Sequence, residues 1–162
     1  MGITRTPMVD DDGSGRTGTI INAAWKTELY NQIDANPARI AYTPTWGATG
    51  SPPTLASSQL TGLYSVSGSV VTVMIHFLLQ AGSLVGAGAW YFSLPPGLVP
   101  IADVSLSGYI TNGSSQFAAA AVKLAPDNVY IVAPGAPNGI GGSLPIVWVH
   151  GDNFTVSGTY FV

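Results

Sequence analysis

The hydrophobic positions follow a helical spacing in one stretch of the chain. Within residues 19–35, apolar side chains recur every four residues, and the resulting stripe consists of Ile21, Trp25, Leu29 and Ile33, with Ile20 beside it. This period predicts an amphipathic helix. The helix should end at Asn36, because the residue before a proline avoids the helical region. A lone helix of this length is marginal in water, so the stripe must pack on the body, on a partner or on copies of itself.

From Tyr42 onward the pattern changes to that of a β protein. Short segments rich in Val, Ile, Tyr, Phe and Thr alternate with clusters of Gly, Pro, Asn and Ser, which is typical of strands joined by turns. The predicted strands are 59–66, 70–79, 89–94, 103–111, 116–124, 129–133, 145–150 and 154–162. The alanine run 118–121 is predicted to be part of a tightly packed strand. About eight strands predict an all-β domain, and we expect a jelly-roll-like β-sandwich.

The chain is therefore expected to have two parts. Residues 1–40 hold an extended arm of about 18 residues, rich in Gly, Asp and Thr, and the short helix. Residues 41–162 form the β-sandwich head domain. We assign attachment and oligomerisation to the first part, with an interface on the helix stripe: Ile20, Ile21, Trp25, Leu29 and Ile33.

Charge is scarce and unevenly placed. The chain has 5 Lys or Arg and 8 Asp or Glu, so 8% of its residues are charged, against about 25% in ordinary domains. Beyond residue 39 the charged residues are Asp103, Lys123, Asp127 and Asp152. The body surface is therefore expected to be buried against copies or neighbours, to be coated with uncharged polar groups, or both.

The same composition argues against several partners and compartments. A net charge of −3 disfavours a nucleic-acid binder, which needs a basic stripe. The longest apolar stretch, 70–79, is too short to span a bilayer as a helix, so membrane insertion is not expected. The N-terminus lacks the apolar core of a signal peptide, and we expect a product made in the cytoplasm.

Several segments resemble parts of bacteriophage virion proteins. Residues 12–35 (DGSGRTGTIINAAWKTELYNQIDA) are similar to the N-terminal segment of many tailed-phage virion proteins. The stretches YTPTW (42–46), LTGLY (60–64), GAWYFSLP (88–95) and VSGTY (156–160) resemble, in order and spacing, the small β-domains at the ends of phage tail-fibre and spike proteins. The resemblance implies a homotrimer on a virion, attached through its N-terminal part, whose β-domain has a display or receptor-binding role. It leaves tail, baseplate and head open.

Residues suited to catalysis or metal binding are few. Asp10 starts a stretch similar to a calcium loop, but the position that needs a bidentate Glu is Ile21. His76 and His150 are expected to be structural, and Asp103, Asp127 and Asp152 fall at predicted turns or strand ends. The sequence therefore predicts no catalytic residue, no metal site and no cofactor, and a hydrolase is the least favoured function.

Candidate binding residues are aromatic side chains and loops. Six aromatic residues could stack on sugars, although most of them are expected in the core or in a trimer interface: Trp46, Trp90, Tyr91, Tyr109, Tyr130 and Trp148. Loops on a rigid scaffold often carry binding. We expect receptor-facing positions in segments 111–116 and 134–143, namely Asn112, Ser114, Asn138 and Ile140.

Together these features predict a non-enzymatic structural protein of a bacteriophage virion. The expected form is a trimeric fibre or spike-type appendage on the virion surface, attached by its N-terminus. Its expected partners are two further copies of the chain, other virion proteins bound through the arm, and a host-surface glycan bound by the head. The alternative is a capsid decoration or head-fibre protein that stabilises or adorns the shell.

Overall fold

The computed structural model describes residues 27, 29–31, 38–56 and 59–162. The chain divides into two compact units, residues 1–36 and residues 37–162. In the first unit Thr27 and residues 29–31 are helical, within the predicted helix, and Leu29 is partly exposed. The other residues of the predicted stripe, Ile20, Ile21, Trp25 and Ile33, lie outside the described residues, as does the predicted arm. Among the described residues, no helix is long and apolar enough to cross a membrane.

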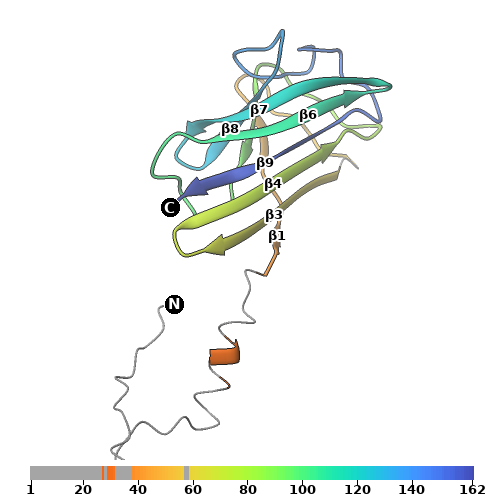
Figure 1. The fold of residues 1–162 in the computed structure, drawn as a ribbon. Helices are drawn as coiled ribbons and strands as arrows, with labels where there is room; N and C mark the ends of the chain where they lie inside the picture. Colours follow the sequence, from red (N-terminus) through yellow and green to blue (C-terminus); the bar gives the residue numbers. More distant parts are fainter. Residues whose placement is uncertain (1–26, 28, 32–37, 57–58) are drawn as a thin grey trace, which may run out of the picture. The chain divides into compact units, whose positions relative to one another are not determined.

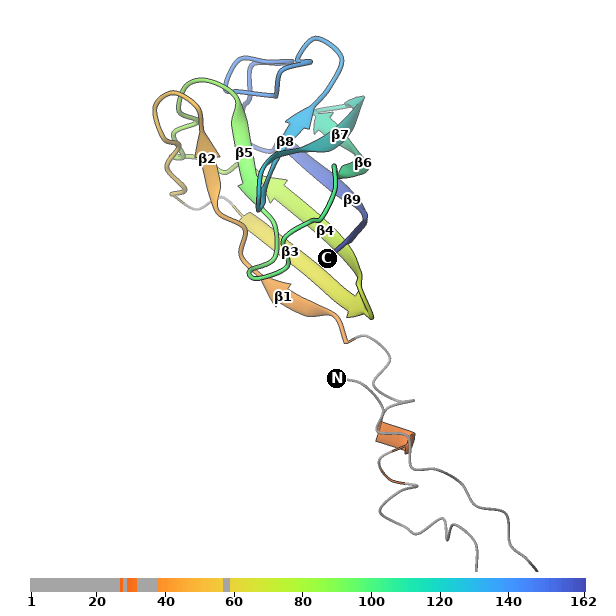
Figure 2. The same ribbon diagram turned by 90° about the vertical axis from the view of Figure 1, so that its left-hand side faces the viewer.

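The described part of the second unit is a single antiparallel sheet. Its strands are β1 (Ile40–Tyr42), β2 (Trp46–Ala48), β3 (Gln59–Ser67), β4 (Val70–Leu78), β5 (Trp90–Ser93), β6 (Ser105–Asn112), β7 (Ser115–Ala125), β8 (Asn128–Val132) and β9 (Asn153–Phe161). They are hydrogen-bonded in the order β1-β3-β4-β9-β6-β7-β8-β5-β2. The sheet curls into a half-barrel, which brings β2 and β5 over the inner face of β3 and β4 (Figures 1 and 2).

The all-β class and most predicted strands are confirmed, with three differences. Residues 145–150 form no strand but belong to a long loop, in which Trp148 is buried while Val147 and Val149 are exposed. The short strands β1 and β2 were not predicted. The strands also form one continuous sheet, without a division into two packed sheets, because β8, β5 and β2 continue the hydrogen-bonded ladder beyond β7.

Alternation along the strands builds the core. In β4 the side chains of Val71, Val73, Ile75 and Phe77 point inward and are at most 1% exposed, whereas the intervening residues face outward, as the two-residue period of a strand requires. The inner face is closed by an aromatic cluster of Trp46, Phe77, Trp90, Phe92, Trp148 and Phe154. Three of the six aromatic residues considered as sugar platforms, the tryptophans, are therefore core residues.

The two ends of the half-barrel differ. The end that we call the loop end carries the irregular segments 79–89 and 133–152 and the turn between β6 and β7. The opposite end carries the turn between β3 and β4, at Gly68 and Ser69, and the segment 94–104. The chain enters the body from the side of this opposite end. Ile40, the first residue of β1, pairs with Tyr64, and Tyr42, the last residue of β1, pairs with Gly62, which lies nearer the loop end.

Candidate functional site: a cleft at the loop end

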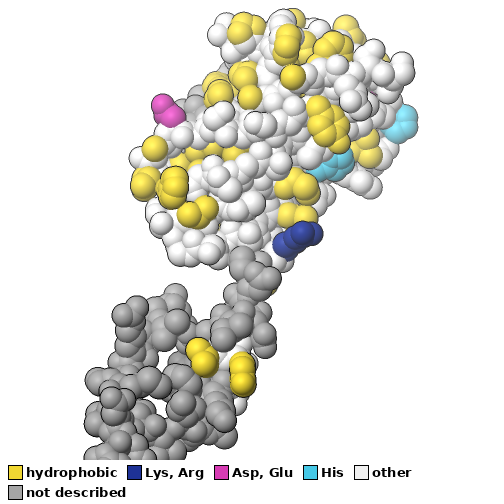
Figure 3. All heavy atoms as spheres, in the orientation of Figure 1, with side chains coloured by type: hydrophobic (Ala, Val, Ile, Leu, Met, Phe, Trp, Pro, Cys, Tyr) yellow, Lys and Arg dark blue, Asp and Glu magenta, His cyan; other side chains and the backbone are white. Residues whose placement is uncertain are grey.

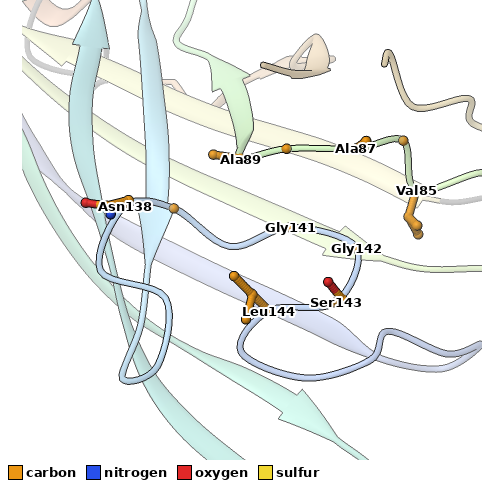
Figure 4. Close-up of a pocket in the computed structure, with 11 residues that line it drawn as sticks. Val85, Ala87, Ala89, Asn138, Gly141, Gly142, Ser143 and Leu144 are labelled. Atoms are coloured by element: carbon orange, nitrogen blue, oxygen red, sulfur yellow. The ribbon is translucent and has the colours of Figure 1, made fainter. Parts of the chain in front are cut away.

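A cleft of about 480 Å³ opens at the loop end, between segments 85–89 and 138–144 (Figure 4). Its size falls within the range of small-ligand sites, about 300–1,000 Å³. The residues that line it are Val85, Gly86, Ala87, Gly88, Ala89, Asn138, Gly139, Gly141, Gly142, Ser143 and Leu144. None of these side chains is charged, so the cleft offers backbone amides, one carboxamide, one hydroxyl and apolar carbon.

The first wall, 85–89, is held by the core and by a neighbouring loop. The indole Nε1 of Trp90 donates to the carbonyl of Val85 at 2.8 Å, and the Trp90 ring is fully buried. The amide of Ala89 donates to Oγ1 of Thr49 at 3.0 Å, and that of Gly50 donates to the carbonyl of Ala87 at 2.9 Å. These hydrogen bonds position segment 85–89 through its backbone atoms, and none of them involves a side chain of that segment.

The second wall, 138–144, is anchored on β8 and on Trp148. The amide of Ile140 donates to the carbonyl of Ile131 at 2.7 Å, and the Trp90 amide donates to the carbonyl of Ile140 at 2.7 Å. Gly141 and Leu144 exchange two backbone hydrogen bonds, and Nε1 of Trp148 donates to the carbonyl of Leu144 at 3.3 Å. Two buried indoles thus fix one carbonyl in each wall.

Glycine is required where the two walls meet. A β-carbon on Gly141 would lie 2.5 Å from the carbonyl oxygen of Gly88, and one on Gly142 would lie 2.6 Å from Cγ2 of Val85. Any side chain at these two positions would push the walls apart. The glycine-rich segments GAGA and NGIGG therefore serve a close approach between two loops.

Exposed apolar side chains are placed in the segments that form and flank the cleft. Leu84, Leu144, Val147 and Val149 are 67%, 50%, 71% and 55% exposed. Exposed apolar residues also occur at the opposite end, at Val99, Ile101 and Phe161, so those beside the cleft add apolar contact area without distinguishing this end.

The structure places the predicted receptor-facing residues at this same end, with one correction. Ser114 is exposed in the turn between β6 and β7, and Asn138 is exposed at the cleft. Asn112 is half-buried and hydrogen-bonded to Asp152. Ile140 is wrong as a receptor contact, because its side chain is 0% exposed and packs in the core.

His76 and Asp152 are hydrogen-bonded to neighbouring strands and loops, and two further acidic residues of the body lie apart from the cleft. His76 on β4 shares a hydrogen bond of 2.9 Å between Nδ1 and Oγ1 of Thr155 on β9, which fits the predicted structural role. Asp152 is 2% exposed and accepts hydrogen bonds from Asn112 and the Val149 amide. Asp103 and Asp127 are exposed, in segments at the opposite end. In the described part of the chain, no three His, Asp, Glu or Cys residues gather as metal ligands would.

A second surface of interest is the convex side of the sheet. We call this the outer face; on β3, β4, β9, β6 and β7 it presents Leu63, Ser65, Thr72, Met74, His76, Thr155, Ser157, Ser107, Tyr109, Ala118 and Ala120. Figure 3 views this face, and the acidic and basic side chains drawn there lie at its margins. The outer face also holds a hollow of about 260 Å³ over β3, β4 and β9.

No protein-family model, curated protein or solved structure matches this chain.

One wall of the cleft lies in a segment predicted to bind, and the other does not. Segment 134–143 is predicted to bind because it is long and irregular. Segment 85–89 is not among the predicted binding segments; its signal is the glycines that alternate with small residues before Trp90, which are typical of a close approach of backbones.

Proposed function

We propose that this chain is a non-enzymatic structural protein of a bacteriophage virion surface. In this proposal it forms a homotrimeric fibre or spike-type appendage, attached through its N-terminal part. The head domain binds a neutral host-surface glycan in the cleft at the loop end. The resemblance of residues 12–162 to phage appendage proteins suggests the setting, and the geometry of the body suggests the binding role.

The polarity of the body is the observation that carries the proposal. The N-terminal part joins the sheet at Ile40, which pairs with Tyr64 toward one end of β3. The cleft is at the other end, beyond the end of β4. Tyr64 pairs in turn with Val73, and the part of β4 from Val73 to Leu78 spans about 17 Å. A point of chain entry that is separated from the cleft in this way is the arrangement that a display protein needs.

The chemistry of the cleft favours a neutral ligand with both apolar and hydroxyl-bearing faces. Asn138, Ser143 and backbone amides offer hydrogen bonds, while Val85 and Leu144 offer apolar contact. A charged ligand would lose hydration there without meeting an opposite charge. Neutral sugars carry hydroxyl groups on an apolar ring and fit this lining.

The placement of carboxylates supports binding without cleavage. Glycoside hydrolysis ordinarily uses two carboxyl groups on either side of the scissile bond. The lining residues of the cleft include neither Asp nor Glu. The carboxylate of Asp152, in the loop that ends at β9, is buried and already accepts hydrogen bonds from Asn112 and Val149.

A cleft-filling variant tests the binding role. The full chain is applied to an array of neutral bacterial surface polysaccharides, together with Ser143→Trp, which fills the cleft from an exposed position. Ser69→Trp is the matched control, because Ser69 is exposed in the β3–β4 turn at the opposite end.

We expect binding by the native chain and by Ser69→Trp, and at least a tenfold loss of affinity for Ser143→Trp. Equal binding by both variants would place the glycan site elsewhere. Folded native protein that binds no neutral polysaccharide on the array would overturn the binding role.

A further inference from the structure

The outer face of the sheet has the properties of an interface between copies of this chain. Two rows of paired residues run across β3, β4, β9, β6 and β7, and neither row contains Asp, Glu, Lys or Arg. The first row is Leu63, Met74, Ser157, Ser107 and Ala120, and the second is Thr61, His76, Thr155, Tyr109 and Ala118. His76 is the one basic residue within these two rows. A solvated sheet face ordinarily carries charged side chains, which discourage association.

Scarcity of charge favours a second copy over a strongly charged partner. A partner with many charges would bury more of them than Arg39, the charged residue among those lining the hollow, could pair, at a cost in desolvation. A second copy brings the same mainly uncharged groups. The face is also not a plain apolar patch, since serine and threonine hydroxyls alternate with Leu63 and Met74.

The face carries a projection and a hollow on different strands. Tyr109 on β6 is 46% exposed and lies between Thr155 and Ala118 in its row. The hollow of about 260 Å³ lies over β3, β4 and the neighbouring side of β9, and the residues that line it include Leu63, Ser65, Thr72, Met74, Ser157 and Arg39. A guanidinium beside a tyrosine ring adds a cation–π attraction to apolar contact, so the lining of the hollow suits a tyrosine side chain.

The curl of the sheet sets the direction of association. Because the half-barrel is convex on this side, the flank with the hollow (β3 and β4) and the flank with Tyr109 (β6), which lie on opposite sides of β9 in the strand order, curve away from β9 in opposite directions. One copy can therefore offer Tyr109 to the hollow of the next while its own hollow accepts a third copy. Such head-to-tail contacts close into a ring when the rotation between copies fits.

We propose that the outer face is the self-association interface of this chain, with Tyr109 of each copy seated in the Leu63–Thr72–Met74 hollow of the next, in a ring of three. This inference rests on the proposed trimer and adds the surface and the contacts that form it.

A charge-swap experiment tests the contact. Thr72→Glu places a carboxylate in the hollow, and Tyr109→Lys replaces the ring by an ammonium group. Ser114→Glu, exposed in the β6–β7 turn outside the outer face, is the control. The molar mass of each full-length variant is measured by light scattering, and circular dichroism checks that each is folded.

We expect the native chain and the control Ser114→Glu to have the mass of three chains. Each single variant on the outer face should have the mass of one chain. The double variant Thr72→Glu/Tyr109→Lys should regain the mass of three chains. Folded single variants that stay trimeric would overturn this interface but leave the proposed trimer intact. A native mass of one chain would overturn both, and a native mass of two chains would overturn the ring.

Discussion

The Nδ2 of Asn112, at the end of β6, lies 3.1 Å and 3.0 Å from the two carboxylate oxygens of Asp152, just before β9. The same carboxylate accepts the Val149 amide at 2.7 Å. The backbone of Asp152 also bonds the Leu79 amide at 2.9 Å. One buried acidic residue thus joins the β6–β7 turn, the start of segment 79–89 and the loop that follows the second wall of the cleft.

Loss of this carboxylate should destabilise the body. Asp152→Ala leaves the Asn112 amide and the Val149 amide without their acceptor, and hydrogen bonds to charged groups contribute about 1.5–3 kcal/mol. We expect the free energy of unfolding, measured by denaturant titration, to fall by about 2–3 kcal/mol. Asp127→Ala, an exposed turn residue, should change it by less than about 0.5 kcal/mol. Equal effects of the two substitutions would contradict the structural role of Asp152.

The hydrogen bond from Trp90 to Val85 should hold the first wall of the cleft. Trp46 offers a matched comparison, since it is also buried but its Nε1 has no hydrogen-bond partner among the described residues. Both Trp→Phe substitutions shrink the same aromatic cluster, but only Trp90→Phe removes a hydrogen bond. We expect Trp90→Phe to cost about 1 kcal/mol more than Trp46→Phe.

Hydrogen exchange gives the local readout for the same pair. In the first wall, the amide of Ala87 donates a hydrogen bond to the carbonyl of Ser51, and the amide of Ala89 donates one to Oγ1 of Thr49. They should exchange faster in Trp90→Phe than in Trp46→Phe. Unchanged exchange at both amides would show that the indole does not hold this wall.

Tyr91 and Gly47 should be energetically coupled. They pair across β5 and β2, and a β-carbon on Gly47 would overlap the Tyr91 ring. Gly47→Ala should therefore destabilise the native chain by at least about 1 kcal/mol, and by much less in a Tyr91→Ala background. The coupling is measured by a double-mutant cycle of unfolding free energies. Additive effects would contradict direct contact between the ring and this glycine.

Stability should decline at alkaline pH because the pKa values of the buried Tyr160 and the partly buried Tyr42 are raised. Burial, with a further contribution from Tyr64, raises the pKa of Tyr160 to about 12, and burial and Tyr160 raise the pKa of Tyr42 above its usual value of 10.0. Above pH 10 the unfolded chain releases protons that the native state retains, so the stabilisation present below pH 10 is lost as the pH rises to about 12.

The slope of stability against pH tests this assignment. Tyr160→Phe removes one of the two groups and should flatten the decline between pH 10 and 12. It also loses the hydrogen bond from the Tyr160 hydroxyl to Leu98, so the slopes are compared and not the absolute stabilities. Tyr30→Phe, at a side chain 59% exposed, is the control. A slope for Tyr160→Phe as steep as that of this control would contradict the assignment.

Local pattern was sufficient for the strands whose two faces differ. Segments 70–79 and 154–162 are predicted as strands and correspond to β4 and β9. In β9, Phe154, Val156 and Tyr160 alternate with Thr155, Ser157 and Thr159. The segment 145–150 shows the limit of this argument. It is rich in Ile, Val and Trp, which favours a strand, but it pairs with no neighbouring strand among the described residues, and strand formation needs that partner. β1 and β2 have only three residues each and give no periodic signal.

The site was predictable only in part, for a related reason. Asn138 could be found because its loop is long and rich in glycine and proline. The opposing wall, the burial of Ile140 and the link between Asn112 and Asp152 all depend on which loops the sheet brings to one end. That arrangement follows from the strand order, which joins segments distant in sequence, such as β4 with β9.

The molar mass of the full chain in solution tests the central claim, self-assembly into an appendage, most directly. One chain has a mass of 16.7 kDa, so the account predicts three times 16.7 kDa, about 50 kDa, by light scattering at micromolar concentration. A folded species of 16.7 kDa that persists as the concentration is raised would contradict it.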